Sequence, residues 1–144
     1  MKFSSLSFKN TGYFSAIIKD YLIQGDKIKP FYKDYPTIEN FKQIIADKEQ
    51  FSTDRTILVN DLKAQYSEAN IKKAPKVFQN IDLLVDGKTF TITTGHQLCL
   101  YTGPLYFIYK IISVINLCKH LKTAYPNYEF VPIYWMATED HDFA

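Results

Sequence analysis

The chain of 144 residues is poor in several residue types, and each shortage argues against a class of protein. Its two cysteines, Cys99 and Cys118, form no CxxC motif and are too few for a disulfide framework, as in proteins of a reducing cytosol. Residues Met1–Ser5 lack an apolar segment, so no secretory signal is expected. The formal net charge is only +2, which gives no indication of nucleic-acid or membrane binding. We therefore expect a cytoplasmic protein.

Long uncharged runs and glycine-rich motifs are also missing. The most apolar stretch, Leu105–Cys118, is interrupted by Lys110 and falls short of the ~18 uncharged residues of a membrane span, so a buried crossover helix is expected there. Gly95 and Gly103 do not have the spacing of the dinucleotide-binding fingerprint, and no Gly-Lys-Ser/Thr of a P-loop is present. The sequence contains no internal repeat.

Residues 1–88 are rich in charge and have helical periodicity. They hold 14 Lys/Arg and 11 Asp/Glu. Residues 89–144 hold only 3 Lys/Arg and 4 Asp/Glu, and such a low charge is expected of a buried α/β core. Apolar spacing and capping residues predict four helices in this part. They are Tyr13–Leu22, a helix capped by Thr37, a helix that begins within residues 52–54, and Lys76–Leu84 with Pro75 in its first turn.

From residue 89 onward the pattern is strand, helix, strand. Thr89–Thr93 is β-branched and aromatic, Pro104–Tyr125 has apolar helical spacing, and Phe130–Ala137 is nearly continuous apolar sequence, as in a strand covered on both faces. Since such a crossover is right-handed in nearly all folds, the two strands are expected to be parallel. Pro132 cannot donate to a ladder, so pairing should begin there or the strand should be irregular.

Two parallel strands do not make a self-sufficient sheet, because parallel sheets need several strands with cover on both faces. The sequence stops at Ala144, inside a polar loop of functional character. We therefore expect the N-terminal part of a longer α/β protein. Its organisation would be a helical segment over residues 1–88 followed by the start of an α/β core over residues 89–144.

A polar cluster follows each predicted strand: Thr94–Gln97 after the first and Thr138–Asp142 after the second. The carboxyl ends of parallel strands meet at one edge, where open α/β sheets bind ligands. Pro104 is expected to be the first residue of the helix, and the N-terminus of that helix could bind a phosphate or carboxylate. Lys110, about 9 Å along the helix at 1.5 Å per residue, is long enough to reach back to that anion, or it lies on the surface.

The two clusters contain groups suited to proton transfer. His96 could transfer a proton near neutral pH, and Glu139–Asp142 place four titratable groups in four residues. Acid/base sites exploit the coupling between such close charges. If this run is extended, alternate residues face opposite ways, so only one pair can point into the site. Simpler interpretations are a tight turn with a solvated histidine and an acidic helix cap, and a metal site would lack a visible second set of ligands.

These residues also carry a family resemblance. The motifs are Thr94-Gly95-His96-Gln97, Leu100–Tyr106, Tyr109-Lys110 and Trp135–Phe143. On these motifs the sequence resembles the bacillithiol-biosynthesis cysteine-adding enzymes, the BshC family of cysteine ligases. Members often have glutamine where this chain has His96, so position 96 supplies either proton transfer or only a hydrogen bond, and they often have a small residue in place of Cys99.

The resemblance implies a Rossmann-like core, related in shape to nucleotidyltransferases, and a C-terminal coiled coil that forms a homodimer. It also implies the last step of bacillithiol biosynthesis, in which cysteine is joined to glucosaminyl-malate. The cysteine carboxylate must be activated for this step. ATP or another nucleotide is the natural candidate, although no motif in the sequence assigns a cofactor. The rest of the core and the coiled coil are expected outside this sequence, so the fragment alone should be inactive.

The sequence thus predicts a candidate site with named roles, without a metal. Two alternatives stay open: a nucleotidyltransferase-like or metal-assisted phosphoryl-transfer enzyme, and a non-catalytic α/β ligand-binding module. The candidate catalytic residues are His96, Asp140, His141 and Asp142, and the candidate substrate-binding residues are Thr94, Gly95, Gln97, Thr102, Gly103, Lys110 and Glu139.

Overall fold

The computed structural model describes residues 4–69, 74–99, 101 and 103–139. The chain divides into two compact units, Met1–Phe41 and Lys42–Ala144. The elements in chain order are η1 (Phe8–Asn10), α1 (Ala16–Leu22), η2 (Lys29–Phe31), α2 (Phe41–Glu49), α3 (Arg55–Glu68), α4 (Pro75–Leu83), β1 (Thr89–Gln97), α5 (Leu105–Ala124) and β2 (Glu129–Ala137).

The first unit consists of short helical turns. Its predicted helix over residues 13–22 begins later, at Ala16, because Ser15 is extended with ψ 162° and forms the N-cap. The next predicted helix also begins late, at Phe41, since hydrogen-bonded turns occupy residues 37–41. Three aromatic rings pack together, with centroids 5.1–6.2 Å apart: Tyr21, Tyr32 and Tyr35.

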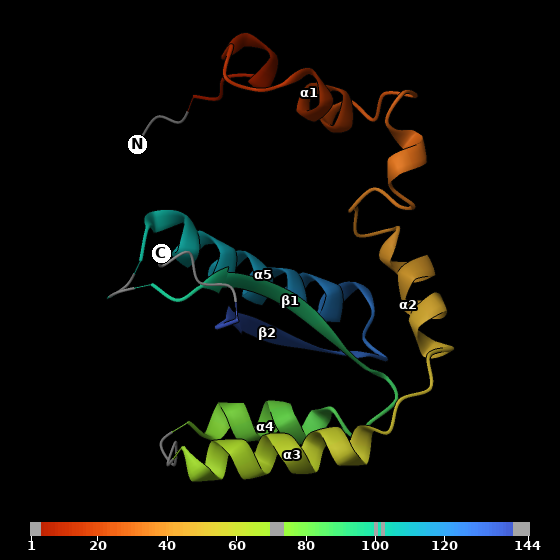
Figure 1. Ribbon diagram of the computed structural model, residues 1–144. Helices are drawn as coiled ribbons and strands as arrows, with labels where there is room; N and C mark the ends of the chain where they lie inside the picture. Colours follow the sequence, from red (N-terminus) through yellow and green to blue (C-terminus); the bar gives the residue numbers. More distant parts are fainter. Residues whose placement is uncertain (1–3, 70–73, 100, 102, 140–144) are drawn as a thin grey trace. The chain divides into compact units, whose positions relative to one another are not determined.

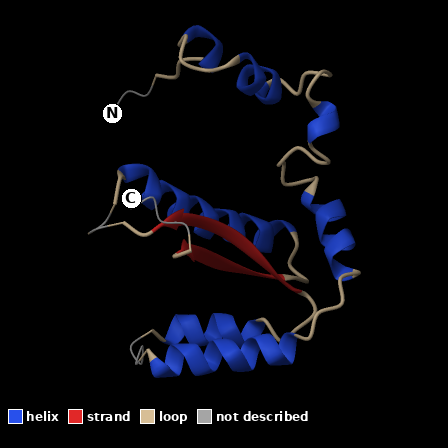
Figure 2. Cartoon of the chain, in the orientation of Figure 1, coloured by secondary structure: helices blue, strands red, loops and turns tan. Residues whose placement is uncertain are grey.

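The second unit is layered around a parallel pair of strands. β1 and β2 pair in register from Thr89 opposite Glu129 to Gln97 opposite Ala137, which confirms the predicted parallel arrangement. Helix α5 covers one face of the pair, and α3 with α4 lies on the other face (Figure 1). Figure 2 shows the same arrangement, with two red strands between blue helices. Both faces of the described strands are therefore covered by helices, as parallel strands require.

The α3–α4 layer is built from local signals in the sequence. Asp54 caps α3, because its carboxylate accepts from the main-chain N–H groups of Thr56 and Ile57 at 3.1 Å. Pro75 occupies the first turn of α4, as predicted. An ion pair of 2.6 Å between Lys63 and Asp82 links the two helices. The core beneath the sheet is a cluster of buried apolar side chains: Val59, Ile81, Leu84 and Val131.

The first strand is longer than predicted. Thr94–Gln97, expected to follow the strand, forms its last four residues, because pairing with β2 continues to Ala137. Strand propensity alone could not show this, since the segment contains Gly95 and glycine is depleted in strands. The long-range partner supplies the main-chain hydrogen bonds that the local sequence does not favour.

The second strand runs through Pro132 without interruption, so the expectation that pairing begins there is wrong. The N–H of Glu129 donates to the Lys88 carbonyl at 3.0 Å, so residue 129 directs its main-chain groups toward β1. Since alternate residues of a parallel strand bond to opposite sides, the nitrogen of Pro132 faces away from β1. The missing donor therefore costs this ladder nothing.

Helix α5 differs from the prediction in its start and in its burial. It begins at Leu105, and Pro104 is the extended N-cap with ψ 158°. Its buried residues are Cys118 and Leu121, whereas a row of large apolar side chains on the helix is exposed, so the expected fully buried crossover is not observed. Among the described helices, none combines the length and the apolar character needed to cross a membrane. The exposed row consists of Leu105, Tyr106, Ile108, Tyr109, Ile112 and Ile115.

Candidate functional site

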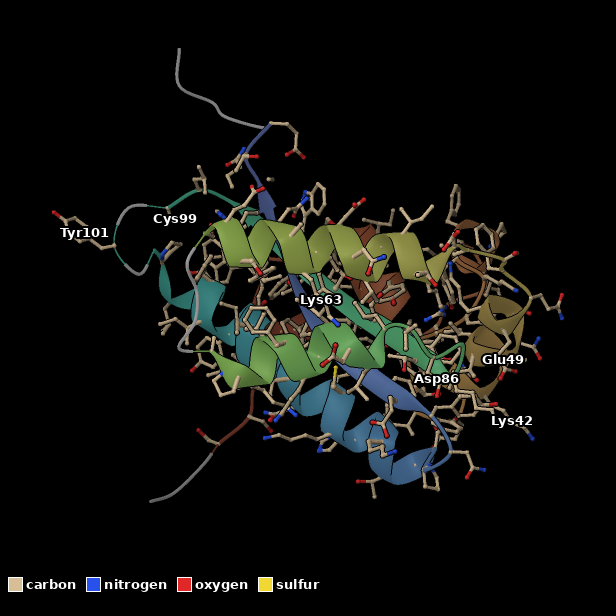
Figure 3. The ribbon with its side chains drawn as sticks, turned by 90° about the horizontal axis from the view of Figure 1, so that it is seen from below. Lys42, Glu49, Lys63, Asp86, Cys99 and Tyr101 are labelled. Carbon is tan, nitrogen blue, oxygen red and sulfur yellow. The ribbon has the colours of Figure 1, made fainter. Side chains whose placement is uncertain are left out.

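The carboxyl ends of β1 and β2 lie side by side. His96 is opposite Met136 in the register, and Gln97 is opposite Ala137. Figure 3 shows Cys99 and Tyr101 at this end of the second unit, with Glu49 and Asp86 at the other end. The structure therefore brings the end of the first predicted polar cluster, at Gln97, and the start of the second, at Thr138, to one edge of the sheet.

Gly95 allows the two strands to stay close at this edge. A Cβ atom on residue 95 would lie 2.8 Å from the Trp135 carbonyl oxygen and 3.0 Å from the Trp135 Cβ, which is too close for any side chain. The Gly95 carbonyl accepts a hydrogen bond of 3.2 Å from Lys110 Nζ. The ammonium group of Lys110 also lies 5.6 Å from the centre of the Tyr106 ring. Lys110 does reach back to the edge of the sheet, where it binds the main chain.

His96 is half-buried and has partners at both ring nitrogens. Nδ1 lies 2.9 Å from the carbonyl oxygen of Gln97, and Nε2 lies 2.6 Å from the hydroxyl of Tyr106. The imidazole also contacts two aromatic rings of α5, with centroids 5.2 Å away for Tyr106 and 6.2 Å for Phe107. The first turn of α5 thus determines the orientation of the imidazole.

Cys99 joins this network from the loop after β1. Its Sγ lies 3.4 Å from His96 Nδ1 and 3.5 Å from the Gln97 carbonyl oxygen. Gly103 packs against Cys99 and has φ +63°. A Cβ at residue 103 would lie only 3.0 Å from the Cys99 Cβ. Gly103 is therefore required both for the left-handed backbone and for the contact with Cys99.

Tyr134 approaches the same histidine from β2. Its hydroxyl donates to the His96 carbonyl at 3.4 Å, and its ring packs edge-on against Phe107 with centroids 5.2 Å apart. Partial burial, and secondarily the neighbouring Cys99 thiol, raise the pKa of the Tyr134 phenol. Tyr134 thus keeps its proton over the physiological range and remains a donor.

The second polar cluster is described only at its start. Trp135 Nε1 donates to the Glu139 carboxylate at 3.3 Å, and the Thr138 N–H donates to the Met136 carbonyl at 2.8 Å. Three predicted catalytic residues, Asp140, His141 and Asp142, lie outside the described residues, as does Thr102. Their predicted roles stay predictions.

The remaining predicted residues differ in their surroundings. Thr94 lines a cavity of about 150 Å³ beneath α5, together with Ile111 and Tyr134, and Tyr134 is the residue that also bonds the His96 carbonyl. The Gln97 main chain binds His96 and Cys99. Within residues 4–69, 74–99, 101 and 103–139, no group of three or more His, Cys, Asp or Glu side chains could hold a metal ion.

Sequence reasoning missed three residues whose side chains contact His96: Cys99, Tyr106 and Tyr134. Nothing in the spacing of Tyr106 distinguishes it from the other aromatic residues of the helix. The available signal was its position in the first turn of the helix that follows the His96 loop. Cys99 carried no motif, and only the path of the loop brings its sulfur to the imidazole.

The family model described as "Bacillithiol biosynthesis BshC, N-terminal Rossmann-like domain" matches residues 1–144. The chain belongs to this family. The predicted α/β, Rossmann-like fold class and the predicted family are therefore confirmed. The division at residues 88 and 89 stays a prediction, and the structure places α3, α4 and the strands in one compact unit.

Relatives named "Putative cysteine ligase BshC" are similar over nearly the whole chain. The protein of Flavobacterium johnsoniae is 56% identical over 140 residues, which are 96% of this chain and 26% of the relative. The protein of Cytophaga hutchinsonii is 46% identical over 139 residues, 96% of this chain and 26% of the relative. That of Bacillus cytotoxicus is 34% identical over 127 residues, 88% of this chain and 23% of the relative. This chain thus spans about a quarter of the length of these relatives.

Proposed function

We propose that this chain is part of a ligase that joins cysteine to glucosaminyl-malate in the last step of bacillithiol biosynthesis. Membership of the BshC family and the name of its relatives support a cysteine ligase. The structural observation that carries the proposal is His96, which has polar partners at both ring nitrogens where the strands end. Open α/β sheets bind ligands at this edge.

The reaction requires an activated cysteine carboxyl group and an amine nucleophile. The amine of glucosaminyl-malate would attack the activated carbonyl carbon, form the amide bond and lose a proton as the activating group leaves. ATP or another nucleotide is the proposed source of activation. The N-terminus of α5 would bind the carboxylate or a phosphate. His96 would take part in the proton transfer, and Asp140–Asp142 would recognise the amine.

The proposal is tested with His96→Ala and Asp140→Asn in the full-length protein, by following glucosaminyl-malate consumption with cysteine supplied. We expect losses on the order of 100-fold for the residue that transfers the proton, since a positioned acid or base typically contributes 10²- to 10⁴-fold. The double variant should lose less than the product of the single losses. His120→Ala is the matched control, because His120 is exposed near the far end of α5.

Each other result has a defined meaning. Near-normal turnover in both variants, with an unchanged circular dichroism spectrum, would contradict the proposed site. A wild-type protein that binds glucosaminyl-malate but never consumes it would favour the ligand-binding module. Metal-dependent turnover of a nucleotide without cysteine would favour phosphoryl transfer. We also propose that the full-length protein is cytoplasmic and forms a homodimer through a C-terminal coiled coil. Sedimentation of the full-length protein would test whether it is a dimer.

A further inference from the structure

We infer that Tyr106 is the group that exchanges a proton with the substrate at this edge, and that His96 acts behind it as the base. This inference deepens the proposed function and rests on it for the identity of the substrate. It assigns catalysis to a helix residue outside the predicted site. It also gives His96 an indirect role, since the histidine reaches the substrate only through the phenol.

The hydrogen bonds determine which imidazole nitrogen carries the proton. The carbonyl oxygen of Gln97, 2.9 Å from Nδ1, can only accept, so Nδ1 carries a hydrogen. In the neutral ring Nε2 then has a free lone pair. Tyr106 must therefore donate its hydroxyl proton to Nε2 across 2.6 Å. This distance is short for such a bond, which indicates a strong interaction.

The imidazole has no nitrogen left for a substrate. Nδ1 faces the Gln97 carbonyl and the Cys99 sulfur, which is 3.4 Å away, while Nε2 faces Tyr106. The edge of the ring is covered by Phe107. By contrast, the Tyr106 side chain is 49% exposed. Tyr106 is thus the more exposed residue of the pair, and it carries the polar group that can reach a substrate.

Lys110 places a positive charge close to the Tyr106 ring. Its ammonium group is held by the Gly95 carbonyl and lies 5.6 Å from the centre of the Tyr106 ring. A cation at this distance stabilises negative charge as it develops on the phenol oxygen. In the part of the chain that the structure describes, the other titratable groups bonded to His96 are Cys99 from the loop and Tyr134 from β2, which donates to the His96 carbonyl.

The proposed step is balanced in atoms and charge. As the substrate amine forms its bond to the activated carbonyl carbon, its N–H proton passes to the Tyr106 oxygen. At the same time the original phenol proton passes to His96 Nε2. Tyr106 ends unchanged, and His96 becomes an imidazolium with hydrogens on both nitrogens. The imidazolium then returns the proton to solvent or to the leaving group through the same hydroxyl.

The hydrogen bond is tested by nitrogen NMR of the full-length protein with labelled histidine. His96→Gln identifies the His96 signals. We expect the wild type to show the Nδ1–H tautomer and a hydrogen-bonded Nε2. Tyr106→Phe should move the Nε2 signal toward that of a lone pair without a donor. Tyr109→Phe removes a hydroxyl three residues further along the same helix and should leave the Nε2 signal unchanged. An Nε2–H tautomer, or no shift in Tyr106→Phe, would overturn the inference.

Kinetics test the role in catalysis. Tyr106→Phe should lower kcat by roughly 10²- to 10⁴-fold with little change in KM, since a proton-transfer group acts in the transition state. The Tyr106→Phe/His96→Gln double variant should be little worse than either single variant. A kcat within threefold of wild type in Tyr106→Phe would overturn the inference.

The failures of the two proposals are distinguishable. A wild type that joins no cysteine would contradict the proposed function, and the phenol could then not exchange a proton in that reaction. The NMR measurement needs no turnover, so it still decides whether Tyr106 donates to His96. If ligation occurs but Tyr106→Phe is fully active, the proposed function stands and the inference falls.

Discussion

The two edges of the parallel sheet are built from different chemistry. At the amino-terminal edge, one arginine and one lysine bind main-chain carbonyl groups. Arg55 Nη1 lies 2.9–3.1 Å from the carbonyl oxygens of Leu84, Asp86 and Thr89. Lys122 Nζ lies 3.0 and 3.1 Å from those of Pro126 and Tyr128, and 2.6 Å from the Glu129 carboxylate.

At the carboxyl-terminal edge, side chains bind one another, and those around His96 are titratable. Tyr106 donates to His96, the Cys99 thiol lies against the same imidazole, and Trp135 donates to Glu139. A permanent cation on carbonyl oxygens can only satisfy acceptors and so stabilises the fold. A tyrosine–histidine pair can change its protonation state. The comparison indicates that one edge maintains the structure and the other can perform chemistry.

The largest expected effect on stability comes from Arg55→Met. Three carbonyl groups lose a charged donor, and we expect local stability to fall by about 3 kcal/mol, in line with bonds to charged groups. Hydrogen-exchange mass spectrometry of the full-length protein should show faster exchange over residues 84–92. Arg55→Lys keeps the charge but not the forked geometry, so it should lose less. Unchanged exchange in Arg55→Met would show that the amino-terminal edge does not depend on this residue.

Gly95→Ala should weaken the opposite edge. The new Cβ would lie 2.8 Å from the Trp135 carbonyl oxygen, and the strands would have to separate there. Overpacking of this kind costs about 1–3 kcal/mol, so exchange at the ends of β1 and β2 should accelerate. Gly87→Ala is the control, because no atom lies within 4 Å of its Cβ position. Equal exchange in the two variants would contradict the close approach.

The two cysteines provide a smaller contrast. Burial raises the pKa of the Cys118 thiol to about 11, so it is almost entirely protonated near pH 8. Cys99 is only partly buried in the His96 network. Iodoacetamide should therefore label Cys99 at least roughly tenfold faster than Cys118, because the thiolate is the reactive form. Peptide mapping after timed labelling measures both rates, and a faster Cys118 would contradict the arrangement.

The smallest effect concerns alkaline pH at the amino-terminal edge. The hydrogen bond to Glu49, with burial as a second cause, raises the pKa of Tyr128. A raised pKa in the folded state means that this stabilisation is complete below the unfolded value near 10 and is lost as pH rises through the folded value. Thermal unfolding between about pH 8 and 11 should show this loss. In Tyr128→Phe the alkaline decline should be smaller, and an identical decline would contradict the Glu49 contact.

Local signals explain much of what could be predicted. The cap at Asp54 and the proline in the first turn of α4 act within one turn of chain, so their effects can be recognised in the sequence. The errors occurred where a distant partner decides the outcome. Gln97 became part of β1 because Ala137 pairs with it. The late starts of α1 and α2 are exceptions, because the extended or turn conformation of the residues just before each helix decides them locally.

The sequence by itself determined the order of strand, helix and strand, and hence the edge at which the polar residues emerge. Apolar periodicity and the handedness of the crossover are sufficient for that conclusion. Only the tertiary structure decided that Tyr106 and Cys99 contact His96. These contacts depend on the exact end of β1, the turn at Gly103 and the first residue of α5. Each is a long-range or backbone property that shifts side chains by several ångströms and leaves no periodic signal in the sequence.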